Sequence, residues 1–297
     1  MVNIIFFITT IIVIFVFVTM FVFTKKYSSV YDPYKLSFKD VRDVEDMAVY
    51  KKNPRVLVFN TYSYPQNKMP AYTDYSTAVN KLYCNKYGYD YIQIAHNIEE
   101  MPPYWMRVKD AADLLSSDNY DVIVYMDLDA VFYDFSKPLD VLLSNNYDFY
   151  VGRDPVVFLF ADFNSLVNSG CFIVKNTNWS KEFLKEWLNA CVDEDSEISG
   201  VCKNDWKFDG KEWVCPGPGC RWAGIKYEQG MLSNLFLSNT KNSQKHICIF
   251  EENVLSNMHP EKPSFVLHLM GNSNNDRIKV FGNFLKGIND KEHIRSE

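Results

Sequence analysis

The chain has 297 residues, of which 47% are hydrophobic and 16% are aromatic, so it can bury the core of one large α/β domain or two small ones. Its formal net charge is −6. This balance lacks the basic surface that binding to nucleic acid requires, so we expect no nucleic-acid partner.

The N-terminal segment contains an uninterrupted apolar run. Ile4 to Phe23 are twenty residues without a charge, which as a helix would cross a hydrocarbon core of about 30 Å. A cleaved signal peptide is the alternative, but no basic segment precedes the run and no small-residue cleavage site follows it. The sequence predicts a transmembrane anchor at 1–26, a polar stem at 27–53 and a single domain at 54–297.

Lysines near the anchor bear on its orientation. Lys25, Lys26, Lys35 and Lys39 all lie on its C-terminal side. Under the positive-inside rule they favour a domain that faces the cytosol.

The chain up to residue 126 alternates between strand and helix patterns. We predict strands at 55–60, 89–94 and 122–126, and helices at 72–87 and 105–115. Gly88 stands where a left-handed helix cap is expected. The alternation is typical of a Rossmann-like α/β fold with a mostly parallel central sheet flanked by helices. Thr61 and Tyr62 follow the first strand and are candidates for contact with a nucleotide base, although a plain surface loop explains them equally well.

Two carboxylates follow the third predicted strand. The β-branched run before them reads as a buried strand, and Asp127 and Asp129 leave its end one residue apart. Ligands of open α/β sheets bind beyond the carboxyl ends of strands. Two acids there can hold a hard divalent cation, which recruits diphosphate oxygens. A surface turn with two solvated acids is the alternative.

The remaining chain continues the mixed pattern. We predict further strands at 148–151, 171–175, 246–251 and 265–268, and helices at 138–143, 178–191 and 227–236. His268 ends its strand as Asp127 and Asp129 follow theirs, which makes it a candidate metal ligand. Glu228 lies in the first turn of a helix, where an acid also has an ordinary structural explanation.

Residues 193–222 break the periodicity, and we expect a long functional loop there. Trp206, Trp213 and Trp222 could stack on a sugar ring if exposed, or pack within the loop. Four cysteines lie in this region without the paired spacing of a zinc site, so disulfides are expected if the domain is lumenal: Cys191, Cys202, Cys215 and Cys220. Three others lie in apolar segments and are expected to be buried thiols: Cys84, Cys171 and Cys248.

Several motifs in fixed order resemble glycosyltransferase family 34, the retaining α-galactosyl- and α-xylosyltransferases of Golgi membranes. They are Tyr104-Trp-Met-Arg107, Tyr125-Met-Asp-Leu-Asp-Ala130, Val167-Asn-Ser-Gly-Cys-Phe172 with Asn176 and Trp179-Ser180, Glu228-Gln229, and Phe265-Val-Leu-His268 with Gly271. The resemblance covers 55–271. It implies a GT-A fold, a UDP-sugar donor, Mn²⁺ or Mg²⁺ as cofactor, and a glycan or glycoprotein acceptor. It also implies a type II membrane protein of the Golgi or endoplasmic reticulum with a lumenal domain, against the lysine distribution.

The resemblance also implies roles for individual residues. The metal ligands would be Asp127, Asp129 and His268. The donor would be bound by Arg107, Asp127, Ser169, Gly170 and Gly271, in addition to Thr61 and Tyr62, which are candidates from their position after the first strand. The residues at the reacting centre would be Glu228, Gln229 and Asn168, with Glu228 acting as a nucleophile or as a stabilising charge.

Two departures from the family pattern concern the donor site. Arg107 stands where the family usually has lysine, and Ser273 stands where a lysine typically follows the histidine-glycine segment. Arg277 or Lys279 could supply the missing contact with the diphosphate.

Two other functions compete with transfer. Asp127-Leu-Asp129 also resembles the nucleophile motif of haloacid-dehalogenase-like phosphatases, but the late acidic pair that those enzymes need does not follow any apolar strand here. Ser273 permits a catalytically degenerate, membrane-anchored sugar-binding protein. Four intact residues argue against it: Asp127, Asp129, His268 and Gln229.

Overall fold

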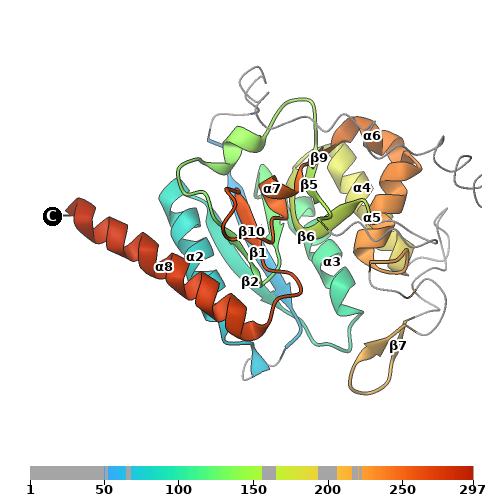
Figure 1. The fold of residues 1–297 in the computed structure, drawn as a ribbon. Coiled ribbons are helices and arrows are strands. Elements are labelled where there is room, and N and C mark those ends of the chain that lie inside the picture. The colour runs from blue at the N-terminus through green and yellow to red at the C-terminus, as the bar shows by residue number, and fades with distance from the viewer. Residues whose placement is uncertain are drawn as a thin grey trace, which may run out of the picture. The chain divides into compact units, whose positions relative to one another are not determined.

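The computed structural model describes residues 50, 53–64, 68–155, 165–192, 206–215, 220 and 223–296 (Figure 1). The predicted anchor at 1–26 and nearly all of the predicted stem lie outside these residues. Among the residues that are described, no helix is long and apolar enough to span a membrane.

A six-stranded sheet forms the centre of the domain, with strand order β2-β1-β3-β6-β5-β9. Its strands are β1 (Val56–Tyr62), β2 (Asp90–Ala95), β3 (Val122–Met126), β5 (Phe149–Arg153), β6 (Val167–Lys175) and β9 (Ile247–Phe250). Only β6 runs antiparallel to its neighbours β3 and β5, and the other adjacent pairs are parallel. The prediction of a mostly parallel sheet is therefore confirmed.

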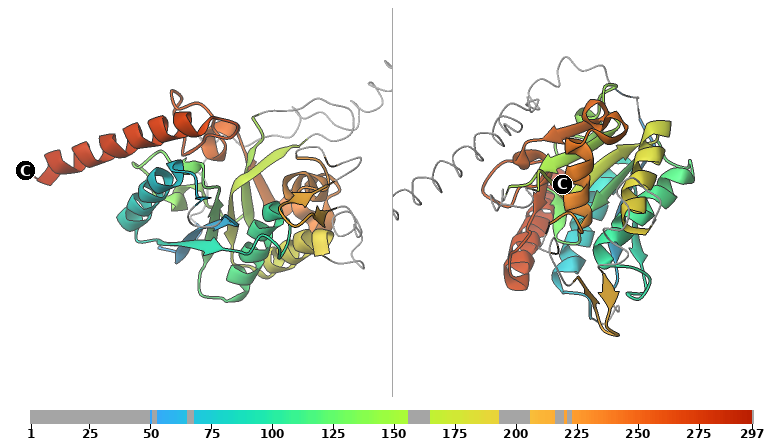
Figure 2. Two further views of the ribbon diagram at one scale, coloured as in Figure 1. Left: turned by 90° about the horizontal axis from the view of Figure 1, so that it is seen from below. Right: turned by 90° about the vertical axis from the view of Figure 1, so that its right-hand side faces the viewer.

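Helices cover both faces of the sheet (Figure 2). On one face lies α2 (Tyr72–Tyr87), whose Tyr83 stacks on Phe132 in the core beneath it, and α8 (Asn274–Ser296) packs beside α2. On the other face lie α3 (Pro103–Ser116), α4 (Asn178–Val192) and α5 (Glu228–Leu237), in mutual contact. Short helical segments complete the described fold: η3 (Leu139–Leu142), η4 (Thr240–Asn242), α6 (Ser243–His246) and α7 (Glu252–Leu255). The helix-covered sheet matches the Rossmann-like α/β prediction.

Two residues mark helix ends in the first half of the domain. The helix α2 ends at Gly88, which adopts the left-handed conformation (φ 71°) and donates its N–H to the Cys84 carbonyl. The helix α3 begins at Pro103, where the missing N–H of proline leaves no extra unsatisfied donor.

The strand β6 is longer than predicted. It begins at Val167 rather than at Cys171, and it includes Asn168, Ser169 and Gly170. The start of β6 was not predicted because Asn168 and Ser169 are polar, whereas the prediction relied on runs of apolar residues. Since β6 runs antiparallel to β3, its first residues lie at the edge where β3 ends, with Cys171 opposite Met126.

His268 ends a strand, as predicted, but this strand lies outside the central sheet. Its strand β10 (Val266–His268) pairs antiparallel with β4 (Ala130–Phe132) in a separate two-stranded sheet. The pairing places His268 opposite Ala130, which directly follows the acidic turn. The register of this small sheet therefore brings the histidine to the two aspartates.

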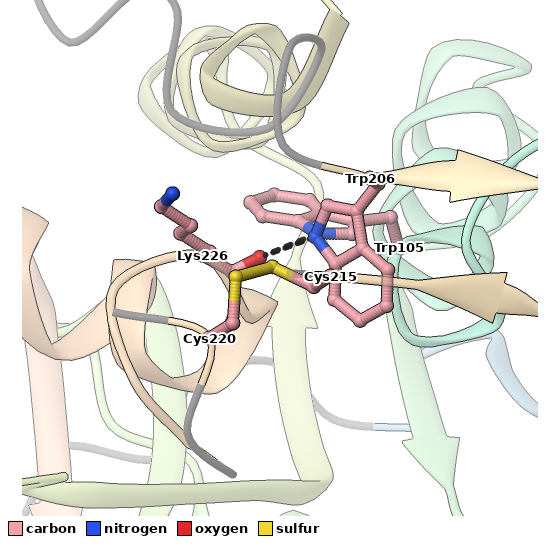
Figure 3. Close-up of a disulfide and its surroundings, with 5 residues drawn as sticks. All are labelled: Trp105, Trp206, Cys215, Cys220 and Lys226. Atoms are coloured by element: carbon pink, nitrogen blue, oxygen red, sulfur yellow. Dashed lines mark hydrogen bonds between the residues drawn. A yellow bond between two sulfur atoms is a disulfide. The ribbon is translucent and has the colours of Figure 1, made fainter. Parts of the chain in front are cut away.

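The segment 193–222 contains a hairpin instead of being irregular throughout, with β7 (Lys207–Phe208) and β8 (Trp213–Val214). A disulfide joins Cys215 and Cys220 just after it (Figure 3). The side chain of Cys191 and all of Cys202 lie outside the described residues. The other three cysteines are buried and form no disulfide, as predicted: Cys84, Cys171 and Cys248.

Candidate functional site

A cleft of about 380 Å³ opens at the carboxyl ends of β1 and β3. Thr61 and Tyr62 contribute to its wall from β1, and Asp127 and Asp129 contribute from the turn after β3. Further lining residues come from α2, α3 and the β7–β8 hairpin, and include Tyr72, Tyr104, Arg107, Glu212 and Trp213. Its position agrees with the rule for ligand sites in open α/β sheets.

The acidic turn is held by backbone hydrogen bonds. The Asp127 N–H donates to the Gly170 carbonyl at 2.7 Å, and the Ala130 N–H donates to the Asp127 carbonyl at 3.0 Å. Oδ1 of Asp127 accepts a hydrogen bond from the Tyr125 hydroxyl at 2.5 Å and lies 3.1 Å from Nη2 of Arg107. The turn therefore presents a carboxylate whose Oδ1 is already fixed in place.

His268 closes the other side of this turn. Its Nε2 lies 3.2 Å from Oδ1 of Asp129 and 3.6 Å from Oδ2 of Asp127. Burial lowers the pKa of His268, but the charges of the two aspartates outweigh burial, so the pKa of His268 is raised above its ordinary value. The imidazole is therefore stabilised in its charged form as long as no other cation neutralises the aspartates.

The three residues fit a divalent cation. One potential ligand atom from each of Asp127, Asp129 and His268 lies within 4.8 Å of the others, and two carboxylates with an imidazole suit Mn²⁺ or Mg²⁺. Nδ1 of the buried His268 has no hydrogen-bond partner among the described residues. Gly170 lies against the cluster, and a Cβ there would clash with the imidazole and lie 2.7 Å from Oδ2 of Asp127. Glycine is therefore the residue that leaves room for this cluster.

Asp129 also pairs with a positively charged side chain, that of Arg277. Its Oδ2 accepts a hydrogen bond of 2.6 Å from Nη2 of Arg277, which extends from the first turn of α8. Burial disfavours the ionised carboxylate, but His268 and Arg277 more than offset this and lower the pKa of Asp129 to about 2. Asp129 is therefore ionised at any physiological pH.

A second cluster lies behind Arg107. Glu228, the first residue of α5, is 3% exposed and accepts a 2.8 Å hydrogen bond from the Ser169 hydroxyl. Its Oε1 lies 3.5 Å from Nη1 of Arg107. Burial raises the pKa of Glu228, and Arg107 and Ser169 reduce that rise without cancelling it. Arg107 thus stands between Glu228 and the aspartates and pairs with both sides.

Gln229 and Asn168 are committed to contacts within the protein. Oε1 of Gln229 accepts from the Ser169 N–H at 3.1 Å, while its Nε2 donates to Asp154 at 2.8 Å and to Ser165 at 2.9 Å. Oδ1 of Asn168 accepts from the Gly170 N–H at 3.0 Å. These bonds hold the first residues of β6 in position.

The predicted site residues divide into those that line the cleft and those that do not. Thr61, Tyr62, Arg107, Asp127 and Asp129 line it. The others lie behind this lining or beyond it: Asn168, Ser169, Gly170, Glu228, Gln229, His268 and Gly271. Gly271 is exposed in the turn between β10 and α8, where its φ of 72° requires the freedom of glycine.

Of the three tryptophans that could either stack on a sugar or pack within the loop, the structure describes Trp206 and Trp213, and it places them differently. Trp213 is half-buried, lines the cleft and donates from its indole N–H to the Ile98 carbonyl at 2.6 Å. Trp206 is 6% exposed, and its indole N–H donates to the Lys226 carbonyl, which also accepts from Trp105 (Figure 3). Trp206 is therefore a packing residue. Trp222 lies outside the described residues.

A buried carboxylate that was not predicted from the sequence supports the β1 end of the cleft. Oγ1 of Thr61 donates to Oδ2 of Asp110 at 2.6 Å, and Nε2 of His96 lies 2.9 Å from the same carboxylate. Asp110 is 4% exposed on the inner side of α3. The sequence does indicate this residue, because Asp110 is an acid among the buried, mostly apolar positions of α3.

The chain was compared with protein-family models, with curated proteins and with solved structures. Residues 99–277 match the family model described as nucleotide-diphospho-sugar transferase. A search of curated proteins found no match. Among solved structures, the chain is similar to a glycosyltransferase involved in the glycosylation of the major capsid of PBCV-1, with 12% identity, coverage of 77% of this chain and 99% of that one, and a TM-score of 0.51. It is also similar to the glycosyltransferase GlyE of Streptococcus pneumoniae TIGR4, with 12% identity, coverage of 81% and 64%, and a TM-score of 0.42.

The family model spans more than half of the chain and includes the acidic turn, the first residues of β6, the start of α5 and His268. The likeness to the PBCV-1 protein agrees in fold. The chain belongs to the nucleotide-diphospho-sugar transferase family and is a glycosyltransferase.

Proposed function

We propose that this glycosyltransferase depends on Mn²⁺ or Mg²⁺ and transfers a hexose or pentose from a UDP-sugar to a hydroxyl group of a glycan or glycoprotein. The observation that carries the proposal is the convergence of Asp127, Asp129 and His268 beside the cleft at the end of β3. Family membership leaves no place for the phosphatase alternative, which relied on the same two aspartates.

The metal-binding residues act on the leaving group. Bound to Asp127, Asp129 and His268, the cation would neutralise the charge that grows on the departing diphosphate. Arg107 lines the same cleft and carries a fixed positive charge there. Its planar guanidinium suits phosphate oxygens, so Arg107 is proposed to bind the donor as well as to pair with Asp127.

The base and ribose are proposed to lie at the β1 end of the cleft. Thr61 and Tyr62 form one wall, and Trp213 lies on the hairpin that borders the cleft. Aromatic faces there can stack on a base or a sugar ring. The hydrogen bond from Thr61 to Asp110 holds the β1 end in place for this contact.

Glu228 is proposed to act at the reacting centre. Its buried carboxylate can stabilise an oxocarbenium-like transition state. In a double displacement it would instead attack the anomeric carbon of the donor sugar as the nucleotide diphosphate leaves, and the acceptor hydroxyl would then displace the carboxylate, which retains configuration. The Ser169 hydroxyl orients this carboxylate. Gln229 and Asn168 are proposed as positioning residues, because their side chains hold Ser169 and Gly170.

The donor sugar, the stereochemistry and the cellular location are proposed from the sequence motifs. Their resemblance to glycosyltransferase family 34 supports a galactose- or xylose-type donor, retention of configuration and a Golgi or endoplasmic reticulum location. Anchoring by the apolar run at residues 4–23 is part of this proposal. The domain would be lumenal in a type II arrangement, whereas the lysines after the run favour the cytosolic side.

Two ligand substitutions test the proposed function. Asp129→Ala and His268→Ala in the full chain are expected to lower donor hydrolysis and transfer at limiting Mn²⁺ by about a hundredfold or more. Asp113→Ala and His259→Ala serve as matched controls, because both residues are exposed and lie outside the cleft. Unchanged hydrolysis and transfer in the two ligand variants would overturn the proposed function.

A further inference from the structure

Arg277 forms an ion pair with Asp129, one of the proposed metal ligands. Its Nη2 donates to Oδ2 of Asp129 at 2.6 Å, and both side chains are largely buried. Its Nε donates to the Leu269 carbonyl at 3.0 Å, and its guanidinium lies over the ring of Tyr72, 5.0 Å from the ring centre. Its Nη1 also donates to Oδ1 of Asn274 at 3.3 Å. These four contacts hold the guanidinium at the edge of the metal-binding cluster.

Both carboxylate oxygens of Asp129 already have a partner in this cluster. Oδ1 of Asp129 faces His268 at 3.2 Å, while Oδ2 is bound by Arg277. A divalent cation at Asp129 must either displace the guanidinium or share one carboxylate with it. In a largely buried site the repulsion between two such cations is weakly screened. Arg277 therefore opposes the binding of metal alone.

A donor diphosphate changes this balance. Tyr72 and Asp129, which contact Arg277 on two sides, both line the cleft. A diphosphate bound to the cation would thus bring several anionic oxygens close to the guanidinium. The fork of N–H donors on arginine fits phosphate oxygens well, so a guanidinium that leaves Asp129 gains a new partner nearby.

We propose that Arg277 couples metal and donor binding: it pairs with Asp129 in the free enzyme and moves to the diphosphate when cation and nucleotide are both bound. This inference rests on the proposed metal site. It assigns to Arg277 a binding role that Lys279, two residues further along α8 and exposed, does not share. Metal and nucleotide then each bind more tightly in the presence of the other, and by the same factor.

Calorimetric titration of the full chain tests the coupling with Mn²⁺ and UDP as probes. Three Kd values are measured: Mn²⁺ alone, UDP alone, and Mn²⁺ in saturating UDP. For Arg277→Gln we expect Mn²⁺ alone to bind about tenfold more tightly than in wild type, and the ratio of the two Mn²⁺ Kd values to fall towards one. The matched control Lys279→Gln, which removes the same charge from an exposed position, is expected to behave as wild type.

The opposite results overturn the inference. Weaker binding of Mn²⁺ alone to Arg277→Gln would mean that Arg277 only orients Asp129. An unchanged ratio of Mn²⁺ Kd values would mean that Arg277 does not reach the diphosphate. If Arg277→Gln does not fold, Arg277→Lys replaces it, and a reduced ratio is again expected because lysine lacks the fork. No Mn²⁺ binding to any variant or to wild type, with or without UDP, would refute the proposed metal site itself, a result distinct from normal metal binding without coupling.

Discussion

Gly170 and His268 lie in such close contact that a single methyl group on Gly170 would overlap the imidazole ring. The same methyl group would lie 2.7 Å from Oδ2 of Asp127. Two strands that belong to different sheets, β6 and β10, meet at this point. The contact explains why a residue without a side chain is required beside the proposed ligands.

Gly170→Ala should therefore disrupt the cluster. We expect Mn²⁺ affinity to fall more than about tenfold, because the methyl group must push His268 or Asp127 out of position. Mn²⁺ titration of the full chain measures the change, and thermal melting shows whether the variant is folded. Gly282→Ala is the matched control, since a Cβ there has its nearest contact at 3.5 Å from the Tyr75 ring. In that helix interior we expect a gain of about 0.5–1 kcal/mol in stability. Normal Mn²⁺ affinity in Gly170→Ala would contradict the account.

Arg107 is expected to contribute to stability as well as to donor binding. Arg107→Ala leaves the carboxylates of Asp127 and Glu228 without their guanidinium, and we expect a loss of about 3–5 kcal/mol with much weaker donor binding. Arg107→Lys should lose less stability, because the charge remains while the two-sided geometry is lost. Thermal melting and the donor KM are the measurements.

The control for Arg107 is another ion pair of arginine and aspartate. Arg55 pairs with Asp121 at 3.3 Å, but the Arg55 side chain is 61% exposed. Arg55→Ala should cost at most about 1 kcal/mol and leave donor KM unchanged. Equal losses in the Arg55 and Arg107 variants would argue against a special role for the Arg107 cluster.

Glu228 should make the stability of the protein depend on pH. Burial raises the pKa of Glu228 in the folded state, so its stabilising contribution is complete below the unfolded pKa and is lost as pH rises through the folded pKa. Glu228→Gln does not titrate. Its stability relative to wild type should therefore increase as pH rises through that window.

Thermal melting of wild type and Glu228→Gln from about pH 4 to pH 8 checks this prediction. Glu182→Gln is the matched control, because Glu182 is an exposed glutamate on α4. A constant difference between Glu228→Gln and wild type across this range would show that Arg107 and Ser169 fully offset the burial of Glu228.

Trp213 is expected to affect donor binding more than turnover. Trp213→Ala removes the aromatic wall and the hydrogen bond to Ile98, and we expect the donor KM to rise about tenfold or more with a smaller change in kcat. Trp179→Ala is the control: Trp179 is also half-buried and donates its indole N–H to a backbone carbonyl, that of Lys241 at 2.8 Å, but it lies away from the cleft. An unchanged donor KM in Trp213→Ala would exclude Trp213 from the donor site.

Local patterns predicted the fold and the acidic turn. The buried run before Asp127 and the glycine after α2 are features of neighbouring residues, so their structural meaning can be read from short segments. The longer β6 escaped because Asn168 and Ser169 are buried through hydrogen bonds to partners elsewhere, and not through apolar side chains.

Contacts between distant segments could not be predicted in the same way. His268 reaches Asp129 through the pairing of β10 with β4, and Arg277 reaches the same carboxylate across 148 residues. The motif resemblance supplied His268 but not the pairing of Arg277 with Asp129. Likewise, the burial of Trp206 depends on the Lys226 carbonyl, which no pattern around Trp206 reveals.

The most direct test of the central claim is a thermal-shift measurement of the full chain with UDP, GDP and common nucleotide sugars, each with and without Mn²⁺. A ligand that binds only the native state raises Tm by mass action. For UDP compounds at about 100 times their Kd we expect a rise of several degrees that depends on Mn²⁺ and is absent in Asp129→Ala. No rise with any nucleotide, with or without Mn²⁺, would contradict a metal-dependent UDP-sugar transferase.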